Sequence, residues 1–180
     1  MNQHAILRRP YDTAHLPPAG AEVTLSAGNE ERAAIAEAYD LLAVDGLSAS
    51  ATLAPGAGNV VSVAGRVVAD IVQACIVSLE PVTQHIDEPF QVDFVPAESA
   101  AAQAAAAREV AVDPEAPDPP EVMEGTTVDL GALVEEMFVL AIDPYPRAPG
   151  AELSVDGSNA AESEDESPFA VLREVMRTRK

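Results

Sequence analysis

The chain has 180 residues and a formal net charge of −20, with 48% apolar but only 4% aromatic residues. This length and composition fit one folded domain with unstructured appendages, whose core consists of Val, Leu, Ile and Ala. A surface this acidic excludes a broad face that grips phosphate groups, because such a face needs clustered Lys and Arg.

The N-terminal part of the chain predicts an arm followed by a strand. Residues 1–20 contain two arginines and three prolines with little apolar periodicity, so we expect either a flexible N-terminal arm or an extended edge segment. Residues 22–26 alternate, with Val23 and Leu25 facing one side, and this period of two is typical of a strand.

A helix is expected next. Asn29 is a plausible N-cap, and Glu30 and Glu31 place negative charge where the helix dipole favours it. We expect the helix to end at Gly46. Its apolar stripe consists of Ile35, Ala38, Tyr39 and Leu42.

The middle of the chain predicts the main part of a sheet. Residues 47–53 alternate between apolar and hydroxyl side chains and stop at Pro55, which indicates a second strand. Residues 61–71 and 86–94 also alternate, so each has a core face and a wet face. Because Pro81 cannot donate a ladder hydrogen bond, we expect a long antiparallel hairpin with its bend at residues 75–81.

After Pro96 the chain predicts an acidic, Ala/Pro-rich connector over residues 97–124, in which residues 97–111 can be helical by propensity but lack large apolar side chains. A second helix is expected from an Asp129 cap to just before Asp143-Pro144. Only Glu135 and Glu136 are expected to face water on this helix, so it should lie against the sheet.

The C-terminal part predicts an acidic disordered linker at residues 151–167 and a short helix with a basic tail at residues 168–180. The expected fold is α+β: an antiparallel sheet of about four or five strands, dominated by a long hairpin, packed by two or three helices and extended by acidic disordered linkers. The folded core should span residues 21–150.

Cys75 is the single cysteine, which excludes an internal disulfide and fits a reducing compartment. No apolar run approaches a membrane span, and the N-terminus lacks the apolar core of a signal peptide. We therefore expect a cytoplasmic protein. The alanine-rich composition is typical of GC-rich bacterial genomes.

Five short motifs, in order, resemble the YceD-type large ribosomal RNA subunit accumulation proteins, and the resemblance runs from about Val23 to Leu172. They are Cys75–Val82, Asp118–Glu121 with Gly125, Asp129–Val134, Asp143–Gly150 and Pro168–Leu172.

The resemblance implies a non-enzymatic factor of bacteria and plastids that is needed for 23S rRNA accumulation, and hence for large-subunit biogenesis. In bacteria, the gene of such a factor commonly lies beside that of a small basic large-subunit ribosomal protein. Many members carry Cys-x-Arg-Cys where this chain has Val77 and Ser78 after Cys75, so one thiolate is left and no zinc site can form there.

The motifs supply the candidate partner-binding residues, and several have two interpretations. Cys75 is either a small strand residue or, with His85 as a base across the hairpin, a nucleophile. Glu80 either orients a partner's arginine or hydrogen-bonds the turn. Arg147 either contacts phosphate or pairs with a carboxylate, and Tyr145 is expected to be half-buried. The full set is Cys75, Glu80, Pro81, Asp143, Tyr145, Pro146, Arg147, Phe169 and Leu172, of which Phe169 and Leu172 either dock on the protein's own core or anchor a partner.

The distribution of charge favours a polypeptide partner. The last eight residues carry +3 and leave −23 on residues 1–172. We expect an assembly factor that binds a basic large-subunit ribosomal protein or the assembling particle, with no cofactor, metal, DNA or membrane. The alternatives are a direct 23S rRNA-binding module and a small hydrolase or redox enzyme that uses Cys75. Possible phosphate contacts are Arg173, Arg177, Arg179 and Lys180.

Overall fold

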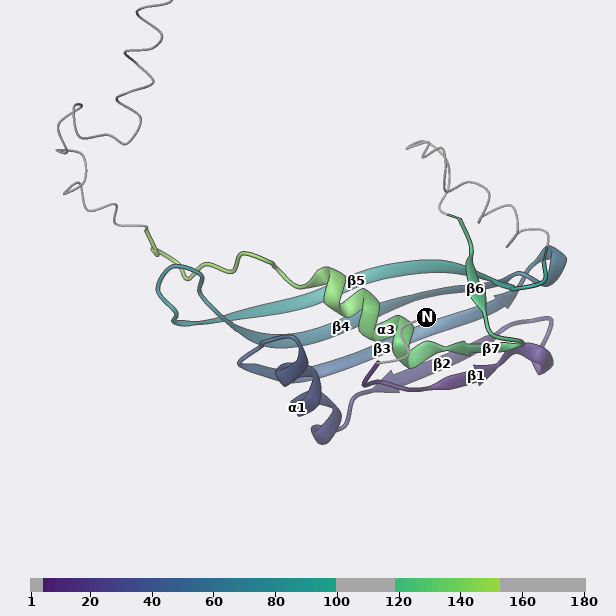
Figure 1. The fold of residues 1–180 in the computed structure, drawn as a ribbon, viewed down its shortest axis with the longest axis horizontal. Helices are drawn as coiled ribbons and strands as arrows, with labels where there is room; N and C mark the ends of the chain where they lie inside the picture. The colour runs from purple at the N-terminus through teal and green to yellow at the C-terminus, as the bar shows by residue number, and fades with distance from the viewer. Residues whose placement is uncertain (1–4, 100–118, 153–180) are drawn as a thin grey trace, which may run out of the picture. The chain divides into compact units, whose positions relative to one another are not determined.

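A five-stranded sheet is the main element of the computed structural model, which describes residues 5–99 and 119–152 (Figure 1). Its strand order is β2-β3-β4-β5-β6, and a second, two-stranded sheet pairs β1 with β7. The strands are β1 (Pro10–Asp12), β2 (Ala21–Ser26), β3 (Ala43–Pro55), β4 (Val61–Ala74), β5 (Pro81–Pro96), β6 (Glu121–Met123) and β7 (Thr127–Asp129), and the helices are α1 (Asn29–Ala38) and α3 (Leu130–Ala141). The predicted α+β class is confirmed.

The long hairpin is confirmed as the largest unit of the sheet. β4 and β5 pair antiparallel from Val61 opposite Phe94 to Ala74 opposite Pro81, and the chain turns between them at residues 75–80. Alternate β4 side chains enter the core because successive residues of a strand point to opposite faces. The buried β4 residues on this face include Val63, Val67, Ala69 and Ile71.

The prediction of an antiparallel sheet was wrong at one edge. β6 pairs parallel to β5, with Phe94 opposite Glu121 and Pro96 opposite Met123, so the sheet is mixed. Strand β6 was not predicted, because three residues are too few to show a periodicity of two. Met123 of this short strand is buried. Residues 100–118 of the predicted connector 97–124, residues 153–167 of the predicted linker 151–167 and the whole predicted helix 168–180 lie outside the described residues.

Helix α1 is shorter than predicted and has a different cap. Gly28, not Asn29, is the N-cap, and the Gly28 N–H donates to Glu31 Oε2 at 2.8 Å. The helix ends at Ala38 because Asp40 adopts a left-handed conformation (φ 54°), which lets the Leu41 N–H donate to the Ala36 carbonyl. Gly46, the expected helix end, instead lies in β3 at a register irregularity.

Helix α3 runs along one face of the five-stranded sheet (Figure 1) and packs against β4 and β5. As predicted, Asp129 caps it, accepting hydrogen bonds from the Gly131 and Ala132 N–H groups, and it ends before Asp143. The prediction that Glu135 faces water was wrong, since its side chain is buried. Neither described helix is long and apolar enough to cross a membrane.

Within residues 5–20 of the N-terminal segment, residues 10–12 form the strand β1 and residues 13–15 form a short 3-10 helix. Leu7 is buried, and β1 pairs with β7. The Arg9 N–H donates to Asp129 Oδ1 at 2.8 Å, and the Arg9 carbonyl accepts from the Leu130 N–H at 3.0 Å. These partners lie about 120 residues further along the chain, so no local pattern in residues 5–20 could reveal them.

Candidate partner-binding site at the end of the hairpin

Two segments far apart in sequence meet where β4 turns into β5. The turn, residues 75–80, is joined to residues 143–149, which follow α3. The Ile76 N–H donates to the Pro146 carbonyl at 2.9 Å, and the Ala148 N–H donates to Cys75 Sγ at 3.3 Å. We call these two segments the hairpin-end site. It contains six of the predicted residues, Cys75, Glu80, Asp143, Tyr145, Pro146 and Arg147, and the seventh, Pro81, follows directly as the first residue of β5.

The Cys75 sulfur is the centre of these contacts. It is buried, and besides Ala148 it accepts hydrogen bonds from the N–H groups of Val77 and Ser78, each at 3.4 Å. The Ala148 N–H first, and then the Ser78 side chain and N–H, stabilise the thiolate more than burial destabilises it. They lower the pKa of the Cys75 thiol from its ordinary value to about 6.

The thiolate should make stability depend on pH. The folded-state pKa of about 6 is lower than the unfolded-state value of roughly 8.5. The contribution of the thiolate to the free energy of unfolding is therefore complete above the unfolded-state pKa and is lost as the pH falls through about 6. We expect the free energy of unfolding of the wild type, measured in urea, to increase relative to that of Cys75→Ser as the pH rises from about 6 to roughly 8.5. Parallel pH profiles for the two proteins would contradict a thiolate at this position.

Two glutamines on the hairpin hold the segment after α3. Gln73 Nε2 donates to the Asp143 carbonyl at 2.9 Å, and Gln84 Nε2 donates to the Ala141 carbonyl at 2.9 Å. Gln84 Oε1 also accepts from the Asp143 N–H at 3.0 Å. The sequence prediction missed both residues. A signal was available, since Gln73 and Gln84 occupy the inward parity of their strands.

The hairpin-end site exposes large apolar side chains. Leu79 is 77% exposed and Tyr145 is 70% exposed, so the prediction of a half-buried Tyr145 was wrong. Ile76 is exposed as well. Leu79 has a φ of 62°, which is unfavourable for a residue with a Cβ, and turn hydrogen bonds to Cys75 hold it there. Strain and apolar exposure at one place are typical of a contact surface.

The charged residues of the site differ in their partners. Ser78 Oγ donates to Glu80 Oε2 at 3.3 Å, which is the turn-bonding alternative for Glu80. Arg147 is exposed and forms no ion pair within the described part of the chain, while Pro146 beside it is buried. Phe169 and Leu172, with Arg173, Arg177, Arg179 and Lys180, lie outside the described residues.

The geometry does not support a Cys75–His85 pair. His85 lies opposite Asp70 in the hairpin register, and its Nδ1 is 2.7 Å from Asp70 Oδ1. His85 therefore contacts the carboxylate of Asp70. Asp70 lies in β4, five residues before Cys75. Residues 5–99 and 119–152 also contain no group of three or more His, Cys, Asp or Glu side chains that could hold a metal ion.

Comparison with known proteins gives one match. The model of a family described as "Large ribosomal RNA subunit accumulation protein YceD" matches residues 63–175. No curated protein and no solved structure matches the chain. The matched residues include the long hairpin except for the first two residues of β4, both segments of the hairpin-end site, and α3.

Proposed function

Because the chain belongs to the YceD family of large ribosomal RNA subunit accumulation proteins, we propose that it is a ribosome biogenesis factor that supports 23S rRNA accumulation by binding a basic large-subunit ribosomal protein or the assembling particle. The family is not a known enzyme family, and its role is the accumulation of large-subunit ribosomal RNA. The proposal places the protein in the cytoplasm, with no DNA or membrane partner.

The observation that carries the proposal is the meeting of two motif segments at the hairpin end. Residues 75–80 and 143–149 are held together by hydrogen bonds and expose Ile76, Leu79 and Tyr145. Exposed apolar anchors on a rigid scaffold are typical of protein interfaces. The net charge of −20 favours a cationic partner, which such an acidic protein attracts from a distance.

A second candidate function is direct contact with ribosomal RNA at the same place. Tyr145 is largely exposed, and Arg147 has no carboxylate partner among the described residues. An exposed aromatic ring can stack on an unpaired base, and a guanidinium can pair with phosphate. The acidic charge of the whole chain limits such a contact to a small area.

Sedimentation of the full-length protein in cell lysates tests the proposal. Wild type should co-migrate with precursors of the large subunit, and Leu79→Gly/Tyr145→Ala should reduce the co-migrating fraction at least about tenfold, which corresponds to about 1.4 kcal/mol. Glycine suits the left-handed conformation at position 79, so this variant should remain folded. Leu42→Ala, which truncates an exposed leucine of the α1–β3 connection, is the control.

Wild type that remains entirely at the top of the gradient would contradict the proposal, and so would a double variant that sediments like wild type. The two candidate functions are separated with purified components. Tight binding of 23S rRNA fragments at physiological salt without any ribosomal protein, abolished by Arg147→Glu, would favour direct RNA contact.

A further inference from the structure

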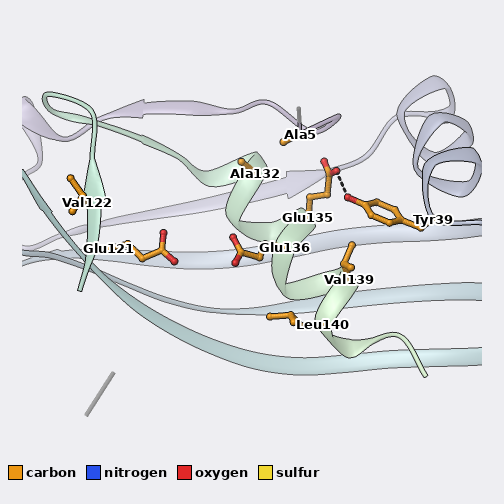
Figure 2. A pocket seen from close by; sticks show the side chains of 9 residues that line it. All are labelled: Ala5, Tyr39, Glu121, Val122, Ala132, Glu135, Glu136, Val139 and Leu140. Atoms are coloured by element: carbon orange, nitrogen blue, oxygen red, sulfur yellow. Dashed lines mark hydrogen bonds between the residues drawn. The ribbon is translucent and has the colours of Figure 1, made fainter. Parts of the chain in front are cut away.

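A groove of about 610 Å³ lies between α3 and β6, apart from the hairpin turn (Figure 2). We call it the acidic groove. Three carboxylates line it, Glu135 and Glu136 from α3 and Glu121 from β6. Its other side chains include Tyr39, Val122 and Leu140.

One of the three carboxylates is already used inside the protein. Glu135 Oε2 accepts from the Leu7 N–H and Glu135 Oε1 accepts from the Tyr39 hydroxyl, each at 2.7 Å. Burial, together with this carboxylate, raises the pKa of Tyr39 to about 12, so the hydroxyl remains a donor. Glu135 therefore forms part of the wall and is not available to a ligand.

The other two carboxylates carry negative charge that the described residues do not neutralise. In Figure 2 the side chains of Glu121 and Glu136 point towards each other across the groove. Neither forms an ion pair within residues 5–99 and 119–152. Burial first, and then the charge of Glu136, raise the pKa of Glu121. A cation placed between them would relieve their repulsion in a partly desolvated position.

Apolar side chains flank these carboxylates. Leu140 is 73% exposed and lies one helical turn after Glu136, so the two share one face of α3. Val122, next to Glu121 in β6, is also exposed, with its side chain on the other side of the strand from Glu121 (Figure 2). Carboxylates beside apolar surface suit Lys and Arg, whose aliphatic stems pack on carbon while their charged heads reach oxygen. Phosphate-bearing and acidic ligands would be repelled.

We propose that the acidic groove binds a cationic polypeptide segment, with a Lys or Arg head between Glu121 and Glu136 and an apolar side chain against Leu140. The inference rests on the proposed function and specifies the chemistry of its partner. Charge complementarity selects this occupant. A second copy of the chain would bring a further net charge of −20 to the same surface, which disfavours self-association.

Binding of a fluorescein-labelled synthetic peptide composed of Lys, Arg and Leu to the full-length protein, followed by anisotropy, tests the inference. Glu121→Gln/Glu136→Gln should weaken binding at least about tenfold, or about 1.4 kcal/mol. Leu140→Ser should weaken it as well. Glu22→Gln/Glu88→Gln removes the same charge from exposed strand positions and should change the affinity less than about twofold, because salt screens charges distant from the peptide.

Equal weakening by the two double variants would overturn the inference, because it would show attraction to the total charge alone. Absence of peptide binding to wild type would overturn it too. A photo-crosslinking residue at position 140 should react in lysates with a Lys/Arg-rich segment of another polypeptide, identified by mass spectrometry. Crosslinks only within the protein's own chain or to a second copy would overturn it.

The sedimentation experiment separates this inference from the proposed function. If wild type co-migrates with large-subunit precursors while Glu121→Gln/Glu136→Gln binds the peptide like wild type, the groove inference fails and the proposed function stands. If wild type does not co-migrate, the proposed function fails regardless of the peptide result.

Discussion

Replacement of Glu135 by alanine should lower the free energy of unfolding by about 3 kcal/mol, since a buried donor left without its acceptor costs about 1–3 kcal/mol. Glu135 is only 3% exposed, and it accepts from both the Leu7 N–H and the Tyr39 hydroxyl. These bonds join α3 to the N-terminal segment and to the end of α1. Urea unfolding followed by circular dichroism measures the loss.

The next residue of the helix provides the control. Glu136 is exposed and has no hydrogen-bond partner among the described residues, so Glu136→Ala should change the free energy of unfolding by less than about 0.5 kcal/mol. Tyr39→Phe removes one of the two bonds and should cost about 1 kcal/mol. In Glu135→Ala, the Leu7 amide should also exchange its hydrogen faster. Equal stability of the Glu135 and Glu136 variants would show that the buried carboxylate is not a structural acceptor.

Substitution of Gly65 by alanine should destabilise the protein by about 3 kcal/mol, the upper part of the range for overpacking a core. A Cβ at position 65 would lie 2.4 Å from the Ser50 carbonyl oxygen and 2.7 Å from Cζ of Phe90. Ser50 belongs to β3, which is bonded on both sides by β2 and β4, so its backbone has little room to shift. Thermal and urea unfolding measure the effect.

A double-mutant cycle separates the two contacts at position 65. Phe90→Leu removes the ring contact only, so Gly65→Ala should cost less in that background but should still be unfavourable because the Ser50 carbonyl remains. Ala64→Val adds side-chain volume at the exposed neighbouring position and should be nearly neutral. A Gly65→Ala protein as stable as Ala64→Val would contradict the close approach of β3 to β4.

Helix α3 links the two surfaces proposed to bind partners. Glu136 and Leu140 line the acidic groove, and Gln84 binds the Ala141 carbonyl at the C-terminal end of the same helix. The hairpin-end site begins two residues later, at Asp143, whose N–H also bonds Gln84. The same helix therefore connects the acidic groove to the hairpin-end site.

Features that depend on neighbouring residues could be predicted from the amino-acid sequence. Alternation over residues 61–71 and 86–94 predicted the hairpin, because a strand with one buried face must repeat every second residue. Asp129 predicted the start of α3, and Pro144 predicted that the helix ends before it, since both act through adjacent backbone groups. The motifs also indicated that residues 75–82 and 143–150 matter, although not that they touch.

Features that depend on partners far along the chain became visible only in the folded protein. The acceptor role of Glu135 requires Leu7, 128 residues away, and the burial of Cys75 requires Ala148, 73 residues away. The exposure of Tyr145 and the parallel pairing of β6 also depend on segments that are far apart in the chain. A side chain's polarity predicts its preferred surroundings, but whether a buried polar atom finds a partner depends on which distant backbone groups the fold brings within about 3 Å of it.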